Sequence, residues 1–294
     1  MMKRSAGEKV FAVFNTIFLL LLCVVFFLPV WHVAMGSISD PLKVAASSGL
    51  YLKPLGKPTL GGYRLIMQNS TILRAYGNTL IYVVSSTLFG LVLTILAAYV
   101  MSTRGLLFGK TFALFVVFTM IFNGGLVPTF LVVNKLGLID TRWALIIPGA
   151  VSAYNIIIMR TSFSEIPGEM LDAARIDGAD EFKILTSIIL PVSKAIIAVI
   201  VLFYAVQHWN AWFNAAIYLQ KSRNLYPLQL TLREIVLQAT ENSIIADADG
   251  QDVMIFRPLI KYATIMISII PMMIVYPFVQ KYFVTGVMIG SVKG

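Results

Sequence analysis

The sequence predicts an all-α, polytopic membrane protein with six transmembrane helices, and three observations lead to this fold class. Hydrophobic residues make up 58% of the 294 positions and charged residues only 13%, whereas charged residues make up about 25% of soluble domains. Six segments are apolar over about 17–25 residues, the length that crosses a bilayer. A polar insert between the fourth and fifth segments holds six of the fourteen acidic residues. We therefore expect a single transmembrane domain over residues 1–294.

The six predicted spans follow from the apolar runs. They lie near residues 10–35, 79–101, 111–133, 143–159, 195–219 and 262–287. The first run follows several basic residues, as a secretory signal does, but its apolar core is longer than the about 7–15 residues of a signal peptide. It is therefore expected to stay as an anchor. A short amphipathic helix on the membrane surface is predicted for Tyr63–Tyr76, before the second span.

The polar insert, residues 160–194, has the pattern of two short helices separated by a glycine. Glu169–Ile176 is predicted to be helical, and Gly178 supplies the permissive backbone that ends this helix. A second helix is predicted from Asp180, whose carboxylate caps it, and Pro191 marks its exit toward the next span. Such an insert lies in water at one membrane face, where a soluble partner can reach it. The alternative is a solvated loop with two amphipathic turns.

The residues of this insert carry a resemblance to a known family. Asp172-Ala-Ala-Arg-Ile-Asp-Gly-Ala179, followed after ten residues by Leu190-Pro191, resembles the coupling motif of binding-protein-dependent ABC importer permeases. The segments 137–141 (Gly-Leu-Ile-Asp-Thr), 164–167 (Ser-Glu-Ile-Pro) and 292–294 (Val-Lys-Gly) are similar to elements of the carbohydrate-type, maltose-permease-like members. The resemblance covers essentially the whole chain. Two positions depart from the family pattern, because Asp172 stands where Glu is usual and Ala195 where Pro is common.

The resemblance implies that residues 160–194 form a cytoplasmic coupling loop that contacts an ATPase. The residues it assigns to ATPase coupling are Glu169, Asp172, Ala173, Ala174, Asp177, Gly178, Ala179, Phe182, Leu190 and Pro191. It also implies a multi-pass protein of the bacterial cytoplasmic (inner) membrane with both termini in the cytoplasm. The positive-inside rule does not decide this orientation, since eleven Lys and Arg residues would lie inside and twelve outside.

The partners follow from the same resemblance. They are two ATPase subunits, an extracytoplasmic solute-binding protein and a second permease subunit, which is either identical or, as the resemblance favours, a different homologue. The chain would form half of a path for an oligosaccharide, in a subgroup that resembles importers of alginate- or pectin-derived oligomers. It would be non-catalytic and hold no cofactor, because ATP and Mg²⁺ would be bound by the ATPase subunits.

A stripe of polar and aromatic residues in the fifth span is the candidate substrate path. Gln207, Asn210 and Asn214 are spaced to share one helix face, with His208, Trp209 and Trp212 beside them. Amides can pair with sugar hydroxyls, and indole faces can cover a sugar ring. The alternative assigns the amides to bonds between helices and the tryptophans to an interfacial belt. Weaker candidates for the path are Asn123, Tyr154 and Asn155.

Other function classes receive little support. The basic residues are scattered, so the net charge of +9 suits anionic lipid rather than nucleic acid. Gly105–Thr111 resembles a phosphate-binding loop but has one residue too few between its glycines. The acidic stretch 247–252 lacks the spacing of an EF-hand, so no metal site is expected. The rival function is an ion-coupled secondary transporter or a membrane enzyme without an ATPase partner. It is disfavoured because the span interiors are almost free of charge and the chain has only two histidines.

Overall fold

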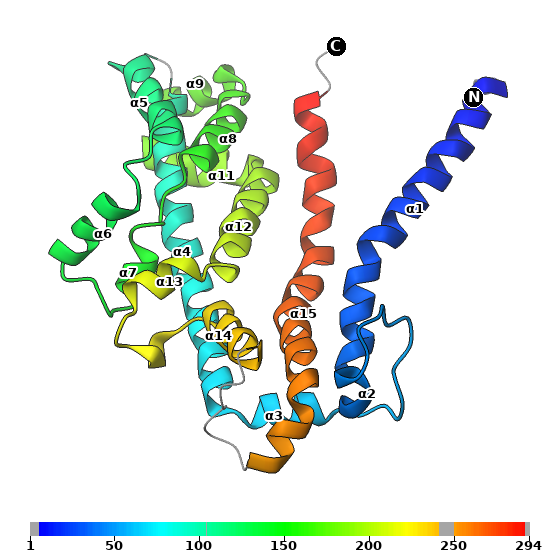
Figure 1. Ribbon diagram of the computed structural model, residues 1–294. Coiled ribbons are helices and arrows are strands. Elements are labelled where there is room, and N and C mark those ends of the chain that lie inside the picture. Colours follow the sequence, from blue (N-terminus) through cyan, green and yellow to red (C-terminus); the bar gives the residue numbers. More distant parts are fainter. Residues whose placement is uncertain (1–5, 104, 241–249, 292–294) are drawn as a thin grey trace. The chain divides into compact units, whose positions relative to one another are not determined.

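The computed structural model describes residues 6–103, 105–240 and 250–291 (Figure 1). Every regular element in these ranges is a helix, so the all-α class is confirmed. The chain divides into two compact units, Met1–Ile72 with Leu232–Ile270, and Leu73–Thr231 with Pro271–Gly294. The 292–294 element and residues 247–249 of the acidic stretch 247–252 lie outside the described residues.

The first unit contains α1 (Ala6–Ser37), α2 (Pro41–Ala45), α3 (Gly61–Gln68), most of α14 (Leu228–Thr240) and the first half of α15 (Gly250–Ser291). The loop between α2 and α3 is fastened to the end of α1. The indole N–H of Trp31 donates to the carbonyl of Leu52 at 3.0 Å, and the N–H of Tyr51 donates to His32 Nδ1 at 2.9 Å.

The second unit contains the second half of α15 and a continuous series of helices between residues 73 and 231. They are α4 (Ser70–Ser102), α5 (Gly109–Ile121), α6 (Leu126–Lys135), α7 (Trp143–Ile146), α8 (Ala153–Ser164), α9 (Gly168–Ile176), α10 (Glu181–Ile184), a π-helical turn (Leu185–Ile189), α11 (Leu190–Val192), α12 (Lys194–Trp209), α13 (Phe213–Tyr218) and a 3-10 turn (Arg223–Leu225).

Tyr204 of α12 lies at the centre of the second unit. Its side chain is fully buried, and its hydroxyl lies 2.7 Å from the hydroxyl of Thr94 on α4. The same hydroxyl accepts the N–H of Ser152, which caps α8, at 3.0 Å. A Cβ atom on Gly90 of α4 would lie 2.4 Å from the carbonyl oxygen of Ala150. The absence of a side chain at Gly90 therefore lets α4 pass directly against the segment between α7 and α8.

Three helices in the described ranges are long and apolar enough to cross a membrane, over Gly7–Ser37, Ser70–Ser102 and Pro258–Pro277. They fall where the first, second and sixth spans are predicted. Two bent pairs bring the number to five if each pair is one span. These are α5 with α6, bent by 110°, and Glu181–Val192 with α12, bent by 85°. The count of six therefore stays a prediction.

Four segments differ from the single helices expected for them. The fifth predicted span, residues 195–219, is divided because α12 ends at Trp209 and α13 starts at Phe213. The third predicted span is interrupted after Ile121, at a Gly124-Gly125 pair, and the fourth is divided by Pro148-Gly149 into α7 and α8. The twelve residues of α8 extend over only about 18 Å, less than the about 30 Å of a bilayer core. The helix predicted for Tyr63–Tyr76 is also divided, because the side chain of Asn69 accepts the N–H of Thr71 at 2.9 Å and starts α4 anew.

Candidate functional site

The helix–glycine–helix segment, Gly168–Ile184, forms the candidate site in the second unit. Pro167 precedes α9, and Gly178 adopts φ +81°, a backbone conformation that side chains with a Cβ rarely take. The carboxylate of Asp180 then accepts the N–H of Lys183 at 2.7 Å, so the N-cap predicted for Asp180 is confirmed. The chain bends by 85° between Glu181–Val192 and α12. If α12 crosses the membrane along the membrane normal, residues 181–192 lie nearly parallel to the membrane surface.

Arg175 links the two short helices and connects them to α4. Its guanidinium donates to Asp172 within α9 and to Glu181 at the start of α10, both at 3.1 Å. The carboxylate of Glu181 also accepts a hydrogen bond from the hydroxyl of Tyr99. The bonds from Tyr99 and Arg175 lower the pKa of the Glu181 carboxyl. Glu181 therefore stays ionised and ties α10 to the end of α4.

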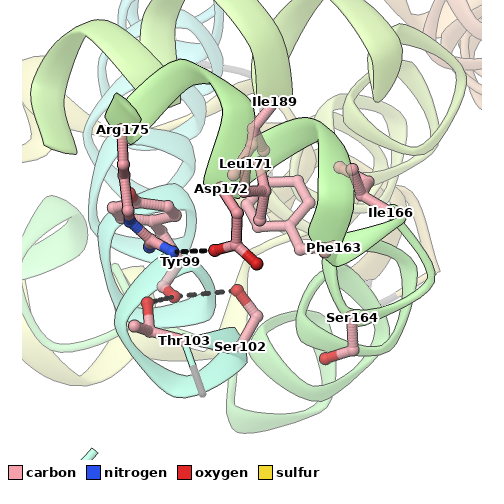
Figure 2. Close-up of a pocket in the computed structure, with 11 residues that line it drawn as sticks. Tyr99, Ser102, Thr103, Phe163, Ser164, Ile166, Leu171, Asp172, Arg175 and Ile189 are labelled. Atoms are coloured by element: carbon pink, nitrogen blue, oxygen red, sulfur yellow. Dashed lines mark hydrogen bonds and ion pairs between the residues drawn. The ribbon is translucent and has the colours of Figure 1, made fainter. Parts of the chain in front are cut away.

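A cavity of about 310 Å³ lies between α9 and the ends of α4 and α8 (Figure 2). Figure 2 shows Asp172 paired with Arg175 on α9, with Tyr99 beside Arg175 and with Ser102 and Thr103 below. Its apolar floor consists of Phe163, Ile166, Leu171 and Ile189, and its polar rim includes Ser102, Thr103 and Ser164. The arrangement places hydrogen-bonding groups around an apolar floor, a composition typical of a binding site.

Large apolar side chains are exposed on the same segment. Ile176 at the end of α9 is 86% exposed and Phe182 of α10 is 72% exposed, on either side of Gly178. Charged residues surround them in the sequence, so this surface does not belong in lipid. Their exposure beside charged residues makes these two side chains candidates for contact with another protein.

The structure places the other predicted coupling residues as follows. Glu169, Ala173 and Asp177 are exposed on or just after α9, while Ala174, Ala179 and Leu190 pack partly buried against the core of the second unit, and Pro191 is exposed in α11. The sequence interpretation missed Tyr99, Arg175, Ile176 and Glu181. The charge pattern did contain Arg175 and Glu181, but nothing in the sequence pointed to Tyr99, which lies on a distant helix.

The structure brings only some residues of the predicted fifth-span stripe together. The argument that Gln207, Asn210 and Asn214 share one helix face is wrong, because α12 ends at Trp209 and a new helix starts at Phe213. Gln207, His208 and Asn214 nevertheless line one cavity of about 60 Å³. The buried His208 Nε2 has no hydrogen-bond partner among the described residues.

The remaining path candidates lie elsewhere. The amide of Asn210 donates to the carbonyl of Val206 one turn earlier, at 2.9 Å. Trp209 is buried against Tyr76, with ring centroids 5.8 Å apart, and Trp212 packs edge-on against Phe213.

The weaker candidates on other helices do not line this cavity. Asn123 lies in the turn between α5 and α6, where its side chain accepts the N–H of Gly125 at 2.9 Å. Tyr154 is half exposed and Asn155 is buried in the first turn of α8.

Residues 90–289 match the family model described as the binding-protein-dependent transport system inner membrane component. This chain belongs to that family. It is 38% identical to the polygalacturonan/rhamnogalacturonan transport system permease protein YtcP of Bacillus subtilis (strain 168), over 94% of this chain and 96% of that protein. It is 36% identical to protein LplC of the same organism, over 100% of this chain and 98% of LplC.

A solved structure agrees with this membership. One chain in the crystal structure of a bacterial ABC transporter involved in the import of the acidic polysaccharide alginate superimposes with a TM-score of 0.85. The two chains are 29% identical, and the match covers 96% of this permease and 100% of that chain. The predicted resemblance to carbohydrate-type ABC importer permeases is therefore confirmed.

The family match includes the helix–glycine–helix segment and, beside the smaller cavity, Gln207, His208 and Asn214. The permease is an inner-membrane component of a transport system rather than a catalyst. This membership favours an importer subunit over an ion-coupled carrier or a membrane enzyme.

Proposed function

We propose that this permease is one membrane subunit of a bacterial ABC importer for an oligosaccharide and that it forms half of the translocation path. Two ATPase subunits bind ATP and Mg²⁺ on the cytoplasmic side, and an extracytoplasmic binding protein delivers the sugar. A second permease, a different homologue, supplies the other half of the path. Both termini of this chain and the helix–glycine–helix segment are cytoplasmic.

The exposed pair Ile176 and Phe182 carries the coupling proposal. These two apolar side chains stand out from a segment rich in charge, at the end of α4 that holds Tyr99. The other end of α4 has a second group of polar contacts, around Asn78. Asn78 and Tyr99 are about 31 Å apart at 1.5 Å per residue, close to the thickness of a bilayer core. The segment is thus accessible to a soluble ATPase at one membrane face.

Two breaks between consecutive helices, α5–α6 and α12–α13, support the proposal that this chain lines a translocation path. Residues 122–125, between α5 and α6, are exposed and have no regular structure. Irregular backbone at membrane depth is tolerated where protein covers it or where it lines a water-filled cavity, but not in lipid. The break after Trp209 lies next to the cavity that Gln207, His208 and Asn214 line. Both breaks therefore fit walls of a polar path that two permeases enclose.

The substrate class rests on the relatives. One is named for the transport of polygalacturonan and rhamnogalacturonan, and the structural neighbour takes part in the import of the acidic polysaccharide alginate. We infer an oligosaccharide derived from an acidic polysaccharide. ATP hydrolysis by the reconstituted complex tests the function directly. We expect stimulation by binding protein loaded with oligogalacturonate or oligoalginate, and an ATPase subunit that fails to co-purify with the permease would contradict the proposal.

The carboxylates on α9 are expected to contribute to assembly. Asp172 pairs with Arg175 at 3.1 Å and Asp177 is exposed. If neither carboxylate contacts a partner subunit, changing both to Asn should have little effect, because exposed charges and ion pairs contribute about 0–1 kcal/mol. If they hold α9 against the ATPase, the double change weakens assembly. Recovery of the ATPase subunit in a pull-down at moderate salt measures this, and Glu165→Gln, on an exposed residue before α9, is the control. Undiminished recovery with the double variant would support the solvated-loop alternative.

Alanine substitutions of Gln207 and Asn210 are expected to have different effects on transport and stability. Gln207→Ala should reduce uptake unequally among oligosaccharides of different length, because Gln207 lines the cavity. Asn210→Ala removes a hydrogen bond to its own helix, a loss of about 0.5–1.5 kcal/mol. It should lower the melting temperature slightly and affect all substrates alike. Equal uptake losses for two oligosaccharides in the Gln207 variant would exclude this residue from the path.

A further inference from the structure

The loop between α2 and α3, residues 46–60, is fastened to the C-terminal end of α1 by acceptors of two kinds. The N–H of Tyr51 donates to His32 Nδ1 at 2.9 Å, and the N–H of Leu55 donates to the hydroxyl oxygen of Ser39, just after α1, at 2.9 Å. Of these two acceptors, only the imidazole changes its protonation state between about pH 5 and 8. The two attachments of this loop therefore differ in their response to acid.

The bond from Tyr51 fixes the protonation state of one ring nitrogen of His32. A backbone N–H can only donate, so the Nδ1 atom that it faces accepts through its lone pair and carries no proton. A proton on Nδ1 would set two N–H groups against each other and abolish the bond. The closed position of the loop therefore requires a neutral imidazole.

Burial makes the loss of this bond consequential. Tyr51 is only 4% exposed and packs in one apolar cluster with Val44 of α2 and Leu259 of α15. Water cannot readily replace the lost acceptor at such a position, and a buried N–H without a partner is unfavourable. Protonation of His32 therefore favours a second position of the loop, in which Tyr51 has left the cluster and its N–H reaches water.

Aromatic rings surround His32. The ring of Tyr51 lies 4.6 Å from the imidazole between centroids, and the ring of Tyr262 on α15 stands edge-on to it at 5.6 Å. These phenols are the titratable groups that face His32 from the loop and from α15, and a phenol ordinarily ionises only near pH 10. On α1 the residues one turn away, Leu28 and Gly36, carry no titratable side chain. No carboxylate of the described residues forms an ion pair with His32, so no such pair holds a protonated imidazole in the closed loop.

The end of α1 that carries His32 extends out of the hydrocarbon. α1 has 32 residues. At 1.5 Å per residue it is about 48 Å long, against about 30 Å for a bilayer core. Polar contacts gather at its C-terminal end, where Tyr63 donates to the hydroxyl of Ser37 at 2.8 Å and the indole of Trp31 donates to the carbonyl of Leu52 at 3.0 Å. His32 is therefore within reach of protons from one aqueous face.

We propose that His32 is an acid-sensitive latch, whose protonation at Nδ1 releases residues 47–53 from α1 while the attachment at Ser39 stays closed. The released loop can bind a proton at Nδ1 and the closed loop cannot. The stability that the bond gives to the closed loop is therefore present while the imidazole is neutral, and it is lost as the pH falls through the range in which imidazole titrates. The proposed function enters only in naming the side, because a cytoplasmic N-terminus places this latch on the extracytoplasmic face.

Hydrogen–deuterium exchange with single-residue resolution tests the latch. The full-length permease is measured in nanodiscs, together with whichever subunits co-purify and without binding protein. Each protection factor is normalised to the intrinsic exchange rate of that amide at the same pH. Between about pH 7.5 and about pH 5.5, we expect the protection of the Tyr51 amide to fall about tenfold or more. The Leu55 amide, held by Ser39, is the control in the same loop and should keep its protection. Equal protection of Tyr51 at both pH values would overturn the proposal.

Two substitutions separate the bond from the titration. His32→Asn places an amide oxygen where Nδ1 lies, and this oxygen accepts at every pH, so the Tyr51 amide should be protected equally at both pH values. His32→Gln places its amide one bond further from the backbone and should leave Tyr51 weakly protected at both. Acid-dependent loss in the asparagine variant would assign the effect to another group. Full protection in the glutamine variant would mean that the bond to His32 does not hold the loop.

The exchange measurement is independent of transport, so it separates the latch from the proposed function. A permease that co-purifies with no ATPase subunit would contradict the importer function and would still report the protection of Tyr51. An importer with full activity whose Tyr51 amide shows no acid dependence would lack the latch and keep the proposed function.

Discussion

Uptake by the importer is expected to fall by about tenfold or more when Gly178 is replaced by valine. Gly178 has φ +81°, and a residue with a Cβ in this region is strained by roughly 1–2 kcal/mol, more for a β-branched side chain. A strain of about 2 kcal/mol favours a rearranged turn about 30-fold. The rearrangement would change the direction of α10 relative to α9 and thereby move Phe182 relative to Ile176.

Steric overlap with neighbouring atoms is not the cause of this effect, because no atom lies within 4 Å of a Cβ built on Gly178. Gly178→Asn is therefore the matched control. Asparagine tolerates the left-handed region, and its side chain is similar in size to that of valine. We expect normal membrane insertion of both variants, with substrate-stimulated ATPase activity lost only in the valine variant. Full transport by a stably assembled valine variant would remove the coupling assignment from this turn.

Local chemistry made the helix–glycine–helix segment predictable from sequence. Gly178 and Asp180 each have a role that depends only on their immediate neighbours, a left-handed turn and an N-cap, and the structure has both. The contact between Glu181 and Tyr99 was not predictable in the same way. It joins residues that are close only because α4 and α10 pack together, and a single sequence has no periodicity that records such packing.

The apolar runs predicted membrane segments better than they predicted continuous helices. Hydropathy reports how apolar a segment is, but it is insensitive to a glycine pair or a Pro-Gly step within the run. The helix-breaking pairs Gly124-Gly125 and Pro148-Gly149 are present in the sequence, but they have little effect on the average hydropathy of the apolar runs that contain them. The end of α12 at Trp209 has no such breaker. There the amide of Asn210 bonds back to Val206, and the stripe predicted on a continuous helix is divided.

Gly137–Thr141 was noticed in the sequence only as a resemblance, with no chemistry attached. The structure supplies the reason, because the left-handed backbone of Asp140 directs its carboxylate toward two N–H groups that lie 81 and 82 positions later in the chain. Long-range side-chain bonds to a loop backbone leave no spacing pattern. The attachment of residues 221 and 222 to Asp140 could therefore not be derived from the sequence alone.

The second large effect is expected from Gly90→Val, which should destabilise the second unit by about 3 kcal/mol. A Cβ on Gly90 would lie 2.4 Å from the carbonyl oxygen of Ala150 and 3.2 Å from the ring of Tyr204. The backbone carbonyl cannot move without loosening Ser152, whose N–H donates to the Tyr204 hydroxyl. Relief of the overlap therefore requires α4 to shift away from α12, and the interior of a packed unit resists such shifts.

Gly77→Val is the matched control for this change, because Gly77 lies on the same helix, is exposed, and has no atom within 4 Å of a Cβ built on it. Thermal unfolding of the purified complex, followed by fluorescence, should show a melting temperature lowered by about 6 °C or more for Gly90→Val. The Gly77 variant should unfold close to the wild type, since valine in a helix is slightly more favourable than glycine. The two substitutions add the same atoms to the same helix, so a difference between them measures the packing at Gly90 and not the helix propensity of valine. Equal melting temperatures would mean that α4 does not approach the segment between α7 and α8 this closely.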